Sequence, residues 1–185
     1  VRAGEILGIA GVDGNGQAEL AETIAGLRPL EAGSISIAGE DISRTSVAER
    51  KHRLGLGYVP EDRHGVGLAM DATVAMNAVL RSFDKPPYAN NRIFDFAAIR
   101  VQAQALVAQY DVRLQSIEQE VRYLSGGNQQ KIILAREIEE GPRVLVVAQP
   151  TKGLDVGAIE LVQKTLLAQR DKGVAILYIS TELEQ

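Results

Sequence analysis

The sequence contains no cysteine and no tryptophan, and only two of its 185 residues are histidine. The lack of cysteine excludes disulfide bridges and a thiolate metal site, although it does not identify a cellular compartment. No apolar run approaches the length that crosses a bilayer, so any role at a membrane requires a partner protein. The N-terminus lacks the basic-then-apolar pattern of a secretory signal. The expected location is therefore cytoplasmic.

The sequence also has no excess of positive charge and few aromatic residues. The formal net charge is -4, and aromatic residues make up 4% of the chain, so neither a basic surface nor a stacking platform for nucleic acid is indicated. We expect no nucleic-acid partner. With 45% hydrophobic residues, the chain is long enough for one sizeable core and a small second subdomain.

Apolar patterns along the chain alternate between the periods of strands and helices, which predicts an α/β fold. The first strand reads as buried, because nearly all of its residues are apolar. The segment 82–91, with two prolines and two asparagines, is predicted to be a mobile loop. Both chain ends fall inside a strand-to-helix unit, so we interpret the sequence as an excised fragment. Strands are predicted at 5–10, 34–38, 56–59, 144–147 and 174–179, and helices at 17–25, 73–80, 94–110 and 156–170.

A glycine-rich segment joins the first predicted strand to the first predicted helix. Its frame from Gly11 to Gly16 fits the phosphate-loop pattern G-x-x-x-x-G-K-[ST], whose backbone N–H groups form a nest for phosphate. Gln17 stands in place of the lysine that reaches the β and γ phosphates, and Ala18 in place of the hydroxyl that binds magnesium. A glycine turn without a ligand is an alternative; a dinucleotide fingerprint is disfavoured by Glu19 at its third glycine position. The candidate phosphate-binding residues are Gly11, Asp13, Gly14, Asn15, Gly16, Gln17 and Ala18.

A second glycine segment, Leu124–Lys131, precedes another predicted helix. Ser125 is suited to cap that helix, and Gly126 and Gly127 allow a ligand to approach the backbone. The positive end of the helix dipole then favours an anion at this point. Taken alone, Ser-Gly-Gly fits an ordinary turn before a helix equally well.

In their order along the chain, these motifs resemble the nucleotide-binding domain of ATP-binding cassette (ABC) transporters, and the resemblance covers nearly the whole chain. Leu124–Lys131 is similar to the signature motif of that family. The resemblance implies an α/β fold with a P-loop NTPase (RecA-like) core and a small helical ABC signature subdomain. It implies one domain over 1–185, with the core at 1–69 and 140–185 and the helical subdomain at about 70–139. ATP is the implied ligand.

Several positions depart from the family pattern in the domain's own nucleotide site. Ala148 and Gln149 follow the strand 144–147, where the family has aspartate and glutamate; a glutamine cannot accept a proton from water as a carboxylate does. Thr181 stands at the position of the family's switch histidine. Glu61 stands where a glutamine commonly senses magnesium, and a solvated charged turn is its alternative reading. The degenerate catalytic positions are therefore Gln149 and Thr181, and no metal ligand is predicted.

Other positions keep the family pattern. Ser125, Gly126, Gly127 and Asp155 match the segments that, in the family, complete the ATP site of a facing domain. The resemblance thus implies a second, degenerate half of a tandem ATPase subunit that drives import of simple sugars or nucleosides, with nucleosides slightly preferred. Magnesium then belongs to the companion site.

The same resemblance implies two protein partners. One is a companion nucleotide-binding domain, expected on the same polypeptide; the other is a membrane permease, with Met70–Arg92 as its docking region. The chain is then peripheral on the cytoplasmic face of the membrane. The assembled transporter is expected to hydrolyse ATP, and the isolated chain to hydrolyse little or none.

Two alternatives remain open at this point. A non-hydrolytic regulatory or dimerisation module on the same scaffold explains the missing acidic residues equally well, although such a module has no need of the retained signature. A soluble ABC protein acting on ribosomes or DNA is disfavoured by the acidic composition. The sequence does not identify the transported substrate.

Overall fold

The computed structural model describes residues 1–12, 14–91 and 93–181. The chain divides into two compact units, each described by itself. Unit 1 comprises residues 1–61, 141–152 and 163–185, and unit 2 comprises residues 62–140 and 153–162. Residues 156–162 of helix α6 (Val156–Asp171) belong to unit 2, and the rest of the helix belongs to unit 1. The predicted boundaries at 1–69, 70–139 and 140–185 stay a prediction.

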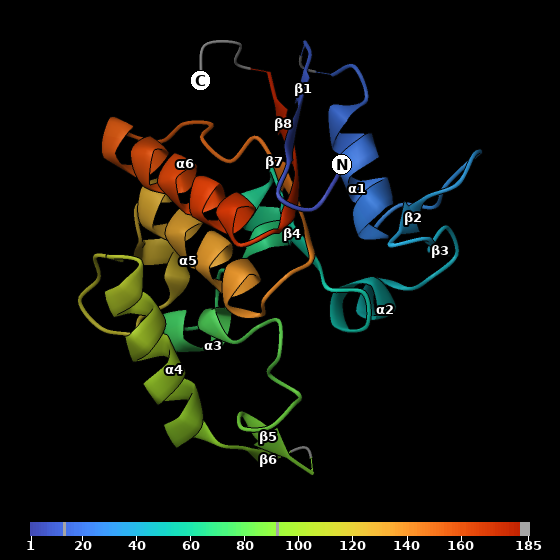
Figure 1. Cartoon of the computed structure of the whole chain (residues 1–185). Helices are drawn as coiled ribbons and strands as arrows, with labels where there is room; N and C mark the ends of the chain where they lie inside the picture. The colour runs from blue at the N-terminus through green and yellow to red at the C-terminus, as the bar shows by residue number, and fades with distance from the viewer. Residues whose placement is uncertain (13, 92, 182–185) are drawn as a thin grey trace. The chain divides into compact units, whose positions relative to one another are not determined.

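Unit 1 is built on a parallel four-stranded sheet with the order β1-β8-β7-β4 (Figure 1). Its strands are rich in valine, isoleucine and leucine, as expected of a sheet with buried faces. Because all four strands run the same way, their carboxyl ends meet at one edge, where ligands bind in open α/β sheets. The strands are β1 (Ile6–Ala10), β4 (Leu56–Val59), β7 (Val144–Ala148) and β8 (Ala175–Ser180).

Strand β1 differs from its predicted environment. The apolar run at 5–10 predicts a buried strand, but β1 lies at the edge of the sheet and Leu7 is 44% exposed. The prediction of burial is wrong because an apolar run alone does not distinguish an edge strand from a central one. The central strands β7 and β8 are nearly all buried, and so is most of β4 at the opposite edge.

Helix α1 (Gln17–Ala25) follows β1 and agrees with its predicted bounds. It ends at Gly26, whose φ of 85° is the left-handed conformation that glycine adopts readily. The buried Arg50 guanidinium then donates to the carbonyl oxygens of Thr23 and Ile24, at 2.6 and 2.8 Å, and so satisfies the end of the helix. Burial lowers the pKa of Arg50.

The remaining elements of unit 1 are short. They are β2 (Ser36–Ile37), its antiparallel partner β3 (Glu40–Asp41) and α2 (Val47–His52). Strand β2 falls within the strand predicted at 34–38, whereas β3 and α2 were not predicted. Ser46 and Glu49 form a capping box at the start of α2. The core cluster contains residues of the sheet, of α1 and of β2, together with two residues of connecting segments: Ala21, Ile37, Ile42, Leu54, Leu56, Val146, Ala148, Leu177 and Ile179.

Unit 2 is mainly helical, with α3 packed against α4 and α5. Helices α3, α4 and α5 begin at polar caps, and the side chain of each cap accepts from backbone N–H groups of the first turn: Thr73, Asp95 and Ser125. The elements are the π-helix η1 (Arg63–Gly67), α3 (Val74–Ala78), β5 (Ala89–Asn90), β6 (Ile93–Phe94), α4 (Phe96–Gln109), the 3-10 helix η2 (Val121–Tyr123) and α5 (Gly126–Glu139).

Two predictions in unit 2 need revision at their edges. The predicted loop 82–91 contains β5, which pairs antiparallel with β6. The helix predicted from residue 94 begins at Phe96, because the Asp95 carboxylate caps it and Phe94 pairs with Ala89 in the hairpin. The rings of Phe83, Phe94 and Phe96 meet edge to face, with centroids 6.1 and 6.0 Å apart, and each ring residue is more than a third exposed.

Buried polar groups anchor α5. The Arg136 guanidinium donates to the carbonyl oxygens of Gly67 and Asn77, at 2.8 and 3.3 Å, and Glu137 pairs with both Arg81 and Arg136. Burial lowers the pKa of Arg136, and the neighbouring Glu137 carboxylate opposes this shift. These contacts fix the helix that Ser125 caps.

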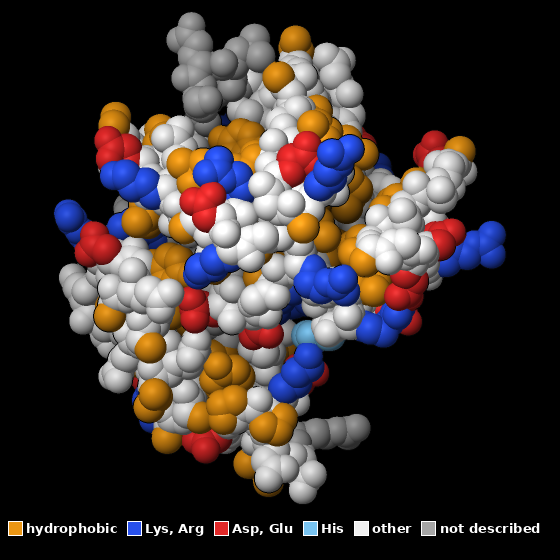
Figure 2. Space-filling view, in the orientation of Figure 1, with side chains coloured by type: hydrophobic (Ala, Val, Ile, Leu, Met, Phe, Trp, Pro, Cys, Tyr) orange, Lys and Arg blue, Asp and Glu red, His pale blue; other side chains and the backbone are white. Residues whose placement is uncertain are grey.

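Charges of both signs are interspersed on the face drawn in Figure 2, where blue Lys and Arg side chains lie among red Asp and Glu side chains. Such a face does not form a continuous basic surface for nucleic acid. Over residues 1–12, 14–91 and 93–181, no helix is both long and apolar enough to cross a membrane.

Candidate functional site

The phosphate loop, residues 11–18, connects β1 to α1 in unit 1. Gly14 and Gly16 have φ values of 83° and 94°, so both adopt the left-handed conformation that forms a concave turn. Gly16 is the N-cap of α1, and because it has no side chain it makes no side-chain capping hydrogen bond. Asp13, which the sequence analysis includes in the loop, lies outside the described residues.

The Gln17 side chain folds back into the phosphate loop. Its Nε2 donates to the carbonyl oxygen of Val12 at 2.8 Å, and its Oε1 accepts from the backbone N–H of Asn15 at 3.1 Å. A Cβ on Gly11 would overlap this Nε2, so glycine leaves room for the amide in this orientation. One N–H of the loop is therefore already bonded to a neutral side chain in place of a phosphate.

Ala148 and Gln149, which replace the two acidic residues, lie at the carboxyl end of β7, and Thr181, which replaces the histidine, follows β8. The Gln149 Nε2 donates to Thr181 Oγ1 at 2.9 Å, and its Oε1 accepts from the Thr181 N–H at 3.1 Å. The structure thus brings together the two predicted degenerate catalytic positions. Glu61 lies in the same unit, and its carboxylate pairs with Lys152 Nζ at 2.6 Å.

The resemblance implies magnesium beside the phosphates, but the residues of unit 1 do not fit it. Ala18 and Ala148 have no ligand atom, and the Gln149 oxygen is bonded to Thr181. Across the described parts of the chain, no cluster of three or more His, Asp or Glu side chains could hold a metal ion. Among the described residues, the hydroxyl and the carboxylates that the family pattern places near magnesium are therefore replaced at Ala18, Ala148 and Gln149.

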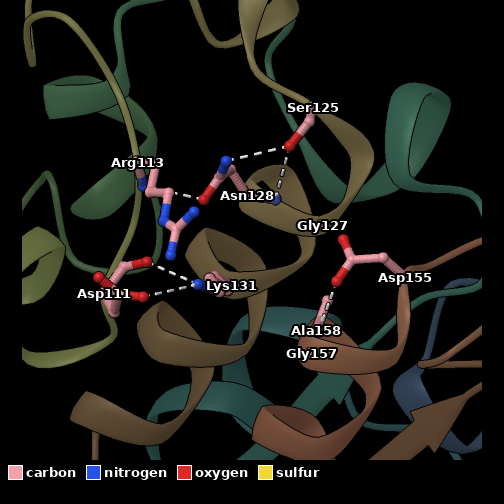
Figure 3. Close-up of a pocket in the computed structure, with 9 residues that line it drawn as sticks. All are labelled: Asp111, Arg113, Ser125, Gly127, Asn128, Lys131, Asp155, Gly157 and Ala158. Carbon is pink, nitrogen blue, oxygen red and sulfur yellow. Dashed lines mark hydrogen bonds and ion pairs between the residues drawn. The ribbon is translucent and has the colours of Figure 1, made fainter.

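The segment Leu124–Lys131 forms an open cavity of about 370 Å³ in unit 2 (Figure 3). Ser125 is the N-cap of the 14-residue helix α5, and its exposed side chain lies at the helix end with the positive dipole. The cavity is open, polar and close to two cationic side chains. Its lining is Asp111, Arg113, Ser125, Gly127, Asn128, Lys131, Asp155, Gly157 and Ala158.

Asp155 lies against the backbone of the signature segment. Its Oδ1 accepts from the Ala158 N–H at 3.0 Å. A Cβ on Gly127 would lie 3.2 Å from the Ala158 Cβ and 3.3 Å from Asp155 Oδ2, which is tighter than ordinary van der Waals contact. Gly127 therefore lets the Asp155 segment pack closely against the start of α5. Gly126 has more room, since its nearest neighbour would be Arg63 Nη2 at 3.7 Å.

Asn128, Arg113 and Lys131 also line this cavity but were not among the predicted site residues, although Asn128 and Lys131 lie in the signature segment. Asn128 connects Ser125 to Arg113: its Nδ2 donates to Ser125 Oγ and its Oδ1 accepts from the Arg113 N–H (Figure 3). Lys131 Nζ donates to the Asp111 carbonyl oxygen at 2.6 Å. The position of Asn128 three residues after the cap is a sequence signal, whereas no local pattern indicates that Arg113 and Lys131 share the cavity.

The predicted site residues thus form two groups. The phosphate loop, Glu61, Gln149 and Thr181 belong to unit 1, and Ser125, Gly126, Gly127 and Asp155 belong to unit 2. In the first group, Gln17 is bonded to the loop itself, Gln149 and Thr181 are bonded to each other, and Glu61 is paired with Lys152. In the second, a helix N-terminus and a hydroxyl border an open cavity, an arrangement that can hold an anion.

Comparison with known proteins identifies relatives over the whole chain. It is 47% identical over 186 residues to the guanosine import ATP-binding protein NupO of Bacillus subtilis. It is 48% identical over 186 residues to the nucleoside import ATP-binding protein NupA of Lactococcus lactis. Identity to a ribose import ATP-binding protein, RbsA 1 of Rubrobacter xylanophilus, is 39%. All of this chain is covered in each case, but it spans only 36%, 36% and 37% of the respective relative.

Solved structures show the same fold. An ATP-binding cassette, MJ0796, in a post-hydrolysis state with ADP and Pi gives a TM-score of 0.79 at 21% identity, covering 99% of this chain and 77% of that one. A nucleotide-free ATP-binding cassette gives 0.80 at 21% identity, covering 100% of this chain and 73% of that one. The profile of the ABC transporter family matches residues 1–152. The chain therefore belongs to the ABC transporter family and has its α/β P-loop NTPase fold with a helical signature subdomain.

Proposed function

We propose that this chain is an ATP-binding component of an ABC importer for simple sugars or nucleosides, with nucleosides preferred. We further propose that it is the degenerate half of a tandem subunit, whose signature segment completes the ATP site of a companion nucleotide-binding half. The observation that carries the proposal is the contrast between the phosphate loop, into which Gln17 folds, and the open cavity at Ser125.

The unit 1 residues favour weak or no catalysis at the chain's own loop. Gln17 supplies an amide where a cation would attract phosphate, and Gln149 is held by Thr181. Because a neutral amide does not accept a proton from water as a carboxylate does, activation of water by Gln149 is not expected. ATP bound at this loop would be held by the backbone nest and helix N-terminus alone, with little dependence on magnesium.

The unit 2 residues suit the opposite role. Ser125 and the backbone at Gly127 would hold the γ phosphate of ATP bound to the companion half, and stabilise its charge as the phosphoryl group is transferred. The N-terminus of α5 adds the positive end of its dipole. Asp155, which packs against Gly127, would couple the two nucleotide sites.

A permease is the proposed membrane partner, and the chain would lie peripherally on the cytoplasmic face. The proposed docking region, 70–92, contains Phe83, which is 39% exposed and contacts the ring of Phe94. Exposed aromatic residues are enriched at protein interfaces, which supports this choice of region. Co-purification of the full-length subunit with a permease, and not with nucleic acid, is the expected result.

The central test is Ser125→Arg in the full-length subunit, with the companion half intact. A long cationic side chain at the cap would fill the cavity, so ATPase activity should be abolished. The matched control Gln104→Arg adds the same side chain at an exposed position of α4 and should retain activity. Unchanged turnover in Ser125→Arg would refute the assigned role, and thermal unfolding of both variants separates this result from misfolding.

The second candidate function is a non-hydrolytic regulatory or dimerisation module. The hydrogen bonds of Gln17 within the loop also fit this function, because they form without a bound nucleotide. Pull-down of an intact nucleotide-binding half by this chain distinguishes the two. Pairing that requires ATP supports the tandem proposal, and pairing independent of ATP supports the module.

A further inference from the structure

The hydroxyl oxygen of Ser125 receives two hydrogen bonds from one neighbour. The backbone N–H of Asn128 donates to Oγ at 3.4 Å, and the Asn128 side-chain Nδ2 donates to the same Oγ at 3.0 Å. A serine hydroxyl has two lone pairs and one hydrogen. Since both lone pairs are used within the protein, the hydroxyl hydrogen is the group that remains for a ligand.

The orientation of the Asn128 amide is fixed by a backbone donor. The Arg113 N–H donates to Asn128 Oδ1 at 2.8 Å. An N–H group cannot accept a hydrogen bond, so the amide oxygen must face Arg113 and the amide nitrogen must face Ser125. Asn128 is partly buried, and this contact joins it to a segment that precedes the helix by more than ten residues. The donor character of Ser125 is thereby set by a tertiary contact.

We propose that Asn128 is a positioning residue that holds the Ser125 hydroxyl as a hydrogen-bond donor toward the terminal phosphate of a nucleotide carried by the companion half. This inference rests on the proposed function, because it needs a nucleotide at the signature segment. It assigns Asn128 no contact with the phosphate itself; the residue acts through Ser125.

The physical reason is the chemistry of phosphate. Its ionised oxygens accept hydrogen bonds, so a hydroxyl that presents a lone pair to them repels the ligand. A hydroxyl held in the donating orientation before the reaction needs no reorganisation as charge develops in the transition state. Such a preorganised donor should influence kcat more than KM.

The decisive variant is Asn128→Asp in the full-length subunit. The new side chain has nearly the same shape, and one oxygen still accepts from the Arg113 N–H. The other oxygen replaces the amide nitrogen and can only accept, so it draws the Ser125 hydrogen inward. We expect kcat for ATP hydrolysis to fall roughly ten- to hundredfold, with a smaller change in KM, as for loss of a hydrogen bond to a charged group.

A double-mutant cycle separates this effect from the added negative charge. Asn128→Ala alone should lower kcat roughly tenfold, because the hydroxyl then rotates freely. In a Ser125→Ala background, the same Asn128→Ala change should alter kcat less than twofold. Gln104→Ala is the control for removing an exposed amide from a helix of the same unit, and thermal unfolding of every variant reports on folding.

The outcomes distinguish this inference from the proposed function. If Ser125→Ala alone leaves kcat unchanged, the proposed function fails and the role of Asn128 fails with it. If Ser125→Ala lowers kcat but the Asn128→Ala effect is absent, or is equally large in both backgrounds, only the positioning role is overturned. A fall in kcat with Asn128→Ala that disappears in the Ser125→Ala background supports the proposal.

Discussion

Two hydrogen bonds join Gln149 to Thr181: the Gln149 side chain donates to the Thr181 hydroxyl and accepts from the Thr181 backbone N–H. Gln149 has a φ of 49°, and its own N–H donates to the Ile179 carbonyl oxygen at 2.8 Å. The ends of β7 and β8 are thus joined where the family resemblance places a catalytic glutamate and a histidine. A structural contact occupies the position of a reactive pair.

The first prediction tests the strength of this contact. Gln149→Ala removes both bonds to Thr181 and should lower the free energy of unfolding by about 1–2 kcal/mol. Thr181→Ala removes only the Oγ1 contact and should cost less. Urea unfolding of this chain measures both, with Gln104→Ala as an exposed control expected to stay within about 0.5 kcal/mol of the parent. Equal stabilities of Gln149→Ala and the control would contradict the prediction.

The second prediction concerns nucleotide binding at the phosphate loop. Calorimetric titration of this chain with ATP should show weak binding that magnesium barely changes. The double variant Gln17→Lys, Ala18→Ser frees the Val12 and Asn15 backbone and restores a cation and a hydroxyl. Its affinity for ATP should rise roughly tenfold or more and become dependent on magnesium.

Gln17→Ala serves as the control for this titration, because it frees the same backbone without adding charge. It should bind ATP less tightly than the double variant. Micromolar, strictly magnesium-dependent binding by the parent chain would show that the Gln17 contacts do not weaken the loop.

The third prediction uses the two neighbouring glycines of α5. Gly127→Ala places a Cβ against Ala158 and Asp155, so it should cost about 1–3 kcal/mol of stability. Gly126→Ala meets no atom closer than 3.7 Å and should cost nothing measurable. Denaturant unfolding measures the difference in the free energy of unfolding between the two variants. A similar stability for both would mean that the Asp155 segment moves away from the added Cβ at little cost.

The fourth prediction is a loss of stability at high pH. Burial raises the pKa of Tyr58 to about 12 from its usual value near 10, and the Glu22 and Glu61 carboxylates add to this shift. Tyrosine is neutral below its pKa, so the folded state retains a proton that the unfolded state releases. The corresponding stability is present below pH 10 and is lost as the pH rises toward 12.

The variant Tyr58→Phe isolates this contribution, because it removes the ionisable group and keeps the ring. Its free energy of unfolding should fall less steeply between pH 10 and 12 than that of the parent. Parallel pH profiles for the two proteins would contradict the assignment to Tyr58.

The sequence predicts much of this fold because its signals are local. The bounds of α1 and β4 follow from apolar spacing between glycine and proline punctuation, and the Ser125 cap follows from its position before a helix. The sequence likewise shows that glutamine replaces the lysine of the family pattern at Gln17 and the glutamate at Gln149. These features depend on residue type and spacing alone.

What the sequence does not predict depends on tertiary contacts. The amide of Gln17 folds onto Val12 and Asn15 only because the loop backbone presents a carbonyl and an N–H at the right distance. The contact of Asn128 with Arg113 joins residues that no periodicity relates. Strand β1 lies at an edge because of sheet order, which an apolar run does not encode.

All three phenylalanines of the chain meet in one partly exposed ring cluster, while tryptophan is absent from the sequence. A single tryptophan introduced at Phe94 would thus be the sole indole emitter in this chain. The emission wavelength of this indole depends on its contact with water. A shift in that wavelength would therefore report when another protein surface covers the ring cluster.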